Sequence, residues 1–164
     1  MTMSLRVAWF NLHMPQAYYC AYFTVRGDGF DAGSMLLSAD TCRERLREIR
    51  QMDKPTAKDK ETATCLELIL EMNMRGIRFL PVDLYRSDVS RFRMEDGNIR
   101  CPFTSLSGFP ESAAQAIVAA RQAGDFLSVE DLQRRTRVGT GTLDMLRTHG
   151  SLEGMSETNQ ISMF

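Results

Sequence analysis

The chain has 164 residues, of which 43% are hydrophobic and 25% are charged, and its formal net charge is −1. This composition excludes an intrinsically disordered chain, and the charge excludes a protein that holds nucleic acid by bulk positive charge alone. No apolar run approaches the roughly 20 residues that cross a bilayer, and Met1–Arg6 lacks a signal-peptide pattern, so we expect a cytoplasmic protein with no membrane partner.

The first predicted element is a helix from about Met14 to Val25. Pro15 suits the first turn, where its missing N–H costs nothing. Apolar residues recur at three- and four-residue spacing, at Ala17, Tyr18, Ala21, Tyr22 and Val25. This pattern favours a buried aromatic face over one that stacks on nucleic acid. Gly27-Asp28-Gly29 then predicts a turn.

A second helix is predicted from a cap at Asp40 to Met52. Its inward residues are Cys42, Leu46 and Ile49. Its other face carries Arg43, Arg47 and Arg50, followed by Lys54. A stripe facing phosphates is one interpretation, but the interspersed Glu44 and Glu48 favour a solvated, ion-paired face.

A longer third helix is predicted to start at Thr56, where Asp59 three residues later completes a capping box. Gly76 is suited to end it. Its apolar surface comprises Cys65, Leu66, Ile69, Leu70, Met72 and Met74. Between Ile77 and Phe103 the apolar period shortens. An extended segment (Ile77, Phe79, Val82) and a β-hairpin are expected there, with Phe92 and Met94 before the turn Glu95-Asp96-Gly97-Asn98 and Ile99 and Cys101 after it.

Two turns that lead into helices follow, and they carry the expected chemistry. The first, around Gly108, runs into an Ala-rich helix that includes Ala113, Ala114 and Ile117. Such a helix start exposes backbone N–H groups and a partial positive charge, which suit a phosphate oxygen. This turn resembles the hairpin of helix–hairpin–helix DNA clamps. That family usually has a second glycine where this chain has Pro110, which removes one potential N–H donor.

The second turn, Val138-Gly139-Thr140-Gly141-Thr142, leads into a helix that Gly150 closes. Before it, Ser128 and Asp131 predict a capping box for a short helix. Two glycines and two hydroxyls suggest an anion-binding nest, surrounded by Arg134, Arg135, Arg137 and Arg147. Plain packing of helical hairpins is the alternative. The residues expected to contact DNA are Ser107, Gly108, Phe109, Glu111, Ser112, Ala113, Arg121, Arg137, Gly139, Thr140, Gly141, Thr142 and Arg147.

The last five residues, Gln160, Ile161, Ser162, Met163 and Phe164, suit an extended peptide that docks in an apolar groove. They resemble the bacterial motif that binds the sliding clamp, with Ile161 and Met163 in positions where leucine is usual. The four cysteines are widely spaced, which predicts reduced and mostly buried thiols rather than a metal site.

Taken together, the chain resembles the carboxyl-terminal part of PolC-type DNA polymerase III alpha subunits. The segments that carry this resemblance are Pro15–Phe23 (PQAYYCAYF), Val82–Asp88 (VDLYRSD), Ile117–Arg121 (IVAAR), Glu130–Gln133 (EDLQ) and His149–Gly154 (HGSLEG). The resemblance implies the end of the fingers region, a duplex-binding region and a clamp-binding tail. It implies duplex DNA, the sliding clamp and the rest of the alpha subunit as partners.

Enzymes of that family use metal-bound carboxylates, with magnesium, in a palm domain that has no counterpart here. Asp83 and Asp88 lie near a turn and suit capping rather than chelation. We therefore expect no catalytic residue, cofactor or metal in this segment. The alternatives are a stand-alone helix–hairpin–helix DNA-binding accessory protein and a protein-interaction module.

The expected fold class is mainly α with a small β-hairpin. The expected divisions are a helical segment (1–76), a β or extended connector (77–103), a tandem helix–hairpin–helix region (104–154) and a flexible tail (155–164).

Overall fold

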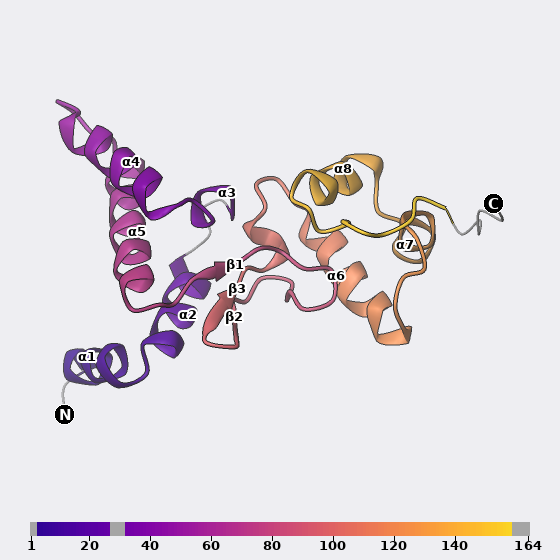
Figure 1. The fold of residues 1–164 in the computed structure, drawn as a ribbon, viewed down its shortest axis with the longest axis horizontal. Coiled ribbons are helices and arrows are strands. Elements are labelled where there is room, and N and C mark those ends of the chain that lie inside the picture. The colour runs from indigo at the N-terminus through magenta and orange to yellow at the C-terminus, as the bar shows by residue number, and fades with distance from the viewer. Residues whose placement is uncertain (1–2, 27–31, 159–164) are drawn as a thin grey trace.

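A computed structural model of the chain describes residues 3–26 and 32–158, and it confirms a mainly helical fold with a small sheet (Figure 1). The helices are α1 (Met3–His13), α2 (Pro15–Arg26), α3 (Ala32–Met35), α4 (Ala39–Gln51), α5 (Ala57–Met74), α6 (Glu111–Ala120), α7 (Val129–Thr136) and α8 (Thr140–Thr148). The strands are β1 (Phe79–Leu80), β2 (Arg93–Glu95) and β3 (Asn98–Arg100), and 3₁₀ turns cover Phe103–Ser105 and Arg121–Ala123.

The elements follow one another along the long axis of the molecule. Figure 1 shows α1 to α5 at one end, the sheet in the middle and α6 to α8 at the other end. One cluster of buried apolar side chains nevertheless extends through all three parts, from Tyr19 to Leu152. None of the helices in the described part of the chain is long and apolar enough to cross a membrane.

Helix α2 begins at Pro15 as predicted. Its buried residues, however, each lie one position after the predicted Tyr18 and Tyr22. Tyr19 and Phe23 are its buried residues, whereas Ala21 and Val25 are exposed. The Phe23 ring lies 5.0 Å from that of Phe79 on β1, so contacts distant in sequence select the buried face. Helix α1, which the sequence analysis did not predict, has no buried residue. The turn predicted at Gly27-Asp28-Gly29 lies outside the described residues.

Helices α4 and α5 form an antiparallel pair whose inward residues are largely those predicted. The cap predicted for α4 was wrong. Ser38 is the N-cap residue and accepts from the Thr41 N–H, while Asp40 lies in the first turn and pairs with Arg43 at 2.7 Å. A second ion pair joins Arg50 to Glu67 at 2.7 Å, which agrees with the solvated, ion-paired face.

The Thr56 capping box on α5 is confirmed. So are Cys65, Leu66, Ile69 and Met72 as buried residues, but Met74 is exposed. Of the four thiols, which are all free, Cys42, Cys65 and Cys101 are buried and Cys20 is half-buried.

The predicted hairpin is the β2–β3 pair, in a sheet of order β1-β3-β2. Strands β2 and β3 are antiparallel, and β1 pairs with β3 in parallel with Phe79 opposite Ile99. Asp96 and Gly97 both have positive φ, 47° and 81°, as the tight two-residue hairpin turn requires.

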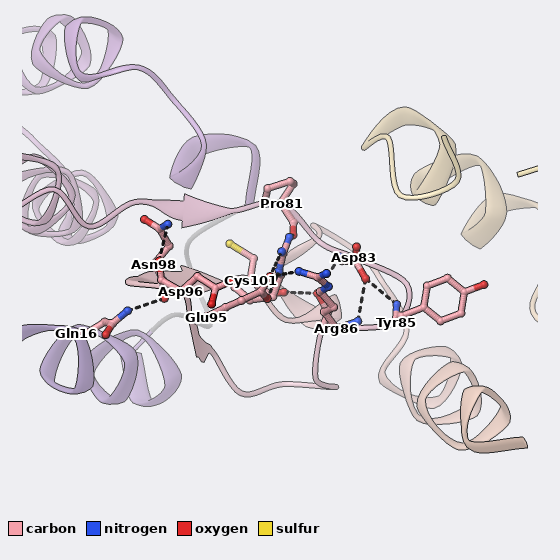
Figure 2. A network of polar contacts seen from close by, with 11 residues as sticks. Gln16, Pro81, Asp83, Tyr85, Arg86, Glu95, Asp96, Asn98 and Cys101 are labelled. Carbon is pink, nitrogen blue, oxygen red and sulfur yellow. Dashed lines mark hydrogen bonds and ion pairs between the residues drawn. The ribbon is translucent and has the colours of Figure 1, made fainter. Parts of the chain in front are cut away.

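A polar network joins the hairpin to the loop that follows β1 (Figure 2). The Glu95 carboxylate pairs with Arg100 at 2.5 Å and with Arg86 at 2.6 Å. These bonds, chiefly that from Arg100, lower the pKa of Glu95 to about 2. Arg100 also donates to the Pro81 carbonyl at 2.8 Å. Asp83 accepts from two backbone N–H groups, those of Tyr85 and Arg86, which confirms its predicted capping role.

Candidate nucleic-acid interface

Helices α7 and α8 are joined by a short turn at residues 137–139. Ser128 is the N-cap of α7 and accepts from the Asp131 N–H at 3.0 Å. Arg137 ends α7 in the left-handed conformation, with φ 56°, and Gly139 is the N-cap of α8. The element is therefore a helix, a tight turn and a second helix.

The second turn is shorter than predicted, and the predicted anion nest is wrong. Thr140, Gly141 and Thr142 already belong to the first turn of α8, and the φ of Gly139 is −71°. A nest needs alternating right- and left-handed residues, which these glycines do not supply. Their main-chain amides instead point along the start of a helix, where a helix binds anions.

The amino end of α8 is open and free of acidic residues in its first turn. The Thr142 and Leu143 N–H groups donate to the Gly139 carbonyl at 3.1 and 3.2 Å, which leaves the Thr140 and Gly141 amides as the first-turn donors. A Cβ built on Gly139 or Gly141 would meet nothing within 4 Å. Thr140 and Gly141 are themselves exposed, so the start of α8 is accessible to a phosphate oxygen.

The first turn, Leu106–Pro110, leads into α6 as predicted. Gly108 has φ +77°, and Phe109 is buried with its ring stacked 5.6 Å from that of Phe103. Pro110 is the N-cap of α6 rather than its first helical residue. The first-turn N–H groups are those of Glu111, Ser112 and Ala113, since the Ala114 N–H donates to the Pro110 carbonyl at 3.1 Å.

The two turns differ in charge. Glu111 places an exposed carboxylate in the first turn of α6, where it competes with a phosphate for the helix dipole. Pro110 removes a donor as well. The α8 turn has neither drawback, so of the two it is the better suited to an anion. The first turn lies against α8, because a Cβ on Gly108 would lie 3.7 Å from Met145 Cε on that helix.

Most arginines predicted around the turns are engaged within the chain. Arg121 donates to the Leu84 and Ser87 carbonyls at 3.1 and 2.7 Å. Burial, with the charge of Arg93, lowers its pKa. Arg147 pairs with Asp144 and Glu157 at 3.0 and 2.7 Å. These contacts brace the fold and leave those two side chains little capacity for phosphate.

Arg135 has a structural role that the sequence did not reveal. Its guanidinium donates to the carbonyls of Ala120, Gly124 and Asp125, and lies 4.5 Å from the centre of the Phe126 ring. These contacts join the carboxyl end of α6 to α7. Arg134 pairs with the buried Asp131 at 2.6 Å, and Asp131 also accepts from the Leu127 N–H.

Arg137 is different, because it is exposed and has no ion-pair partner in residues 3–26 and 32–158. Of the other predicted contact residues, Ser107, Ser112, Thr140 and Gly141 are exposed, Ala113 is half-buried, and Thr142 is buried. The candidate interface thus reduces to the amino ends of α6 and α8 with Arg137 beside the latter. The predicted clamp-binding residues Gln160–Phe164 lie outside the described residues.

Comparison with known proteins agrees with this architecture. A family model described as "Helix-hairpin-helix motif" matches residues 76–161, and the chain belongs to this family.

Over 163 residues, 99% of its length, the chain is also similar to several polymerases named DNA polymerase III PolC-type. It is 42% identical to that of Bacillus subtilis (strain 168), 40% to that of Clostridium perfringens (strain 13) and 39% to that of Thermotoga petrophila. The chain thus matches a segment of PolC, and it spans only 11–12% of the length of these curated relatives.

Proposed function

We propose that the chain is a non-catalytic segment of a PolC-type replicative polymerase that binds the backbone of duplex DNA. The observation that carries this proposal is the amino end of α8, where Thr140 and Gly141 are exposed and no first-turn residue is acidic. No atom would lie within 4 Å of a Cβ placed on Gly139 or Gly141. Two amides and the positive end of a helix dipole bind a phosphate without a lysine. This agrees with a chain whose net charge is −1.

Binding of this kind is indifferent to base sequence. Main-chain amides at helix ends contact phosphate oxygens, which every nucleotide shares, and phosphate contacts position a protein without reading bases. A polymerase segment that holds DNA of any sequence requires this property. The family match and the similarity to PolC-type polymerases support the same conclusion.

Replacing Gly139 and Gly141 with glutamate tests the proposal. Neither site has a steric obstacle, and carboxylates at a helix amino end stabilise the helix. The same carboxylates repel phosphate. We expect the double variant to fold normally and to lose at least tenfold in duplex affinity, measured by fluorescence anisotropy at low salt.

The matched control is alanine at both positions, which adds a Cβ without charge. It should keep duplex affinity within about threefold, because the amides remain in place. Unchanged binding by the glutamate variant, with a native circular dichroism spectrum, would show that α8 is not the phosphate site. A wild-type chain that binds no duplex at low salt would favour a protein-interaction module.

We also propose that Gln160–Phe164 bind the sliding clamp. The support is the pattern of one amide side chain with apolar and aromatic anchors, which suits an extended peptide in a groove. Deleting these five residues should abolish retention on immobilised bacterial clamp and leave duplex affinity nearly unchanged. Retention that survives the deletion would contradict this assignment and locate the clamp contact elsewhere in the chain.

The remainder of a PolC-type polymerase is the third proposed partner, and α1 supports it. None of the residues of α1 is buried, and its large apolar side chains are at least 46% exposed. These side chains are Met3, Leu5, Val7, Trp9, Phe10 and Leu12. A helix whose large apolar side chains are this exposed needs a protein surface to cover them. This chain matches only about one-eighth of the relatives' length, and we propose that the remainder of such a polymerase covers α1.

A further inference from the structure

The segment that enters β2 presents two arginines side by side on a rigid backbone. Phe92 is buried and its ring lies 6.0 Å from Phe23 and 5.7 Å from Phe79. Its N–H donates to Thr24 Oγ1 at 3.1 Å, and its carbonyl accepts from Cys20 Sγ at 2.9 Å. Because side chains alternate along extended backbone, Arg91 and Arg93 both point away from the core that holds Phe92.

The charge of Arg93 does not stabilise the fold, because its neighbours are also positively charged. Arg93 lies directly opposite Arg100 in the β2–β3 ladder, and like charges in that position repel. Its charge also disfavours the protonated form of Arg121. An arginine that is repelled by its neighbours is a local inconsistency of the kind that functional sites show.

The nearby carboxylates are already engaged or face other groups. Glu95, the closest on the same strand face, is held by Arg86 and Arg100. Asp83 accepts hydrogen bonds from backbone N–H groups. The negative charge of Asp88 favours the protonated form of Arg121, and that of Asp96 favours the protonated form of Arg86. Within residues 3–26 and 32–158, neither Arg91 nor Arg93 forms an ion pair. Both side chains are exposed.

We propose that Arg91 and Arg93 form a second phosphate-binding site that contacts the same DNA as the helix–hairpin–helix turns. Arg93 lines a depression of about 320 Å³ together with Arg86, Met94 and Glu95. Guanidinium groups bind phosphate through two parallel hydrogen bonds, and here two such groups emerge from one pinned strand. This inference rests on the proposed function, since the ligand is the same nucleic-acid backbone.

The position of the site fits a duplex that already contacts the turns. Arg121 ends α6 and donates to the Leu84 and Ser87 carbonyls, in the loop that the Arg86–Glu95 ion pair joins to β2. The first turn lies at the amino end of the same helix. A ten-residue helix is about 15 Å long, which corresponds to four or five base steps along a strand. The two sites therefore contact different phosphates and do not compete for one.

The charge balance explains why such a site is needed. Residues 104–158 hold five arginines against seven acidic residues, and Arg134, Arg135 and Arg147 pair with carboxylates. The turns therefore contribute shape and amide donors but little long-range attraction. Arg91 and Arg93 add to the unpaired charge of Arg137 and draw a polyanion toward that surface.

The test is the double variant Arg91→Gln and Arg93→Gln, titrated with duplex DNA at several salt concentrations. Each phosphate contact contributes about 0.9 to the slope of log affinity against log salt, so the slope should fall by about 1.8. Affinity at low salt should fall at least tenfold. The matched control, Arg47→Gln with Lys54→Gln, removes two exposed charges from the α4–α5 pair and should leave the slope unchanged.

The outcomes separate this inference from the proposed function. If the wild-type chain binds duplex and the Gly139/Gly141 glutamate variant does not, the function stands. An unchanged salt slope in the Arg91/Arg93 variant then overturns the second site alone. A fall in slope equal to that of the control pair also overturns it, since that result reflects net charge. Both arginines are exposed, so the variants should keep the wild-type thermal midpoint, which circular dichroism checks.

Discussion

Arg137, a single residue, combines an unfavourable backbone conformation with an exposed positive charge. It adopts φ 56° without being glycine, a conformation that costs about 1 kcal/mol or more in side-chain clashes. The same conformation places an exposed guanidinium at the turn before α8. Sequence reasoning selected Arg137 among the arginines around this turn, but could not show that Arg121, Arg135 and Arg147 are held by distant carbonyls or carboxylates.

Arg137→Gly should therefore weaken DNA binding without weakening the fold. Glycine relieves the left-handed strain and adds flexibility to the unfolded chain, so unfolding free energy should stay within about 1 kcal/mol of wild type. Duplex affinity should fall about three- to tenfold through the lost charge. Arg137→Lys is the matched control and should keep most of the affinity. Equal affinity of the glycine variant and wild type would assign Arg137 a purely conformational role.

At the scale of elements, the sequence predicted those that local chemistry determines. The Thr56 capping box, the Asp96-Gly97 hairpin turn and the start of α2 at Pro15 depend on neighbouring residues alone, and all three are confirmed. The wrong cap at Asp40 was a local error, since Ser38 accepts from the Thr41 N–H, but other errors have a different origin. Phe79 and Phe92, distant in sequence, select which face of α2 is buried. The apolar residues of α1 do not gather on one face, so no helical period predicts that helix.

Helix α1 gives a prediction at this scale. Changing Trp9 and Phe10 to glutamate should leave the fold intact, since both side chains are about half exposed. It should abolish co-elution with a PolC-type polymerase from which the matching segment has been deleted, because two charges would enter an apolar interface. Leu127→Glu, at an exposed apolar site near α7, is the control and should co-elute. Self-association of the wild-type chain through α1, lost in the variant, would contradict docking to the polymerase.

At the scale of the molecule, connections between distant segments place the two turns on one framework. Arg121 holds the loop after β1, and Ser151 Oγ donates to the Val82 carbonyl at 2.7 Å across the same loop. The residues Val82–Ser87, which supported the resemblance to PolC, therefore link the sheet to the helical hairpins. Composition and periodicity predicted the fold class but could not predict these links, because each one joins a side chain to a backbone carbonyl far along the chain.

Amide chemical shifts during titration with a duplex show which backbone N–H groups contact phosphate. With the chain labelled with nitrogen-15, the account predicts that the largest saturable changes occur at the Thr140 and Gly141 amides, with smaller ones at Ser112 and Ala113. These amides should respond alike to duplexes of unrelated sequence. Saturable changes that leave Thr140 and Gly141 unmoved, or that depend on base sequence, would contradict backbone binding at the start of α8.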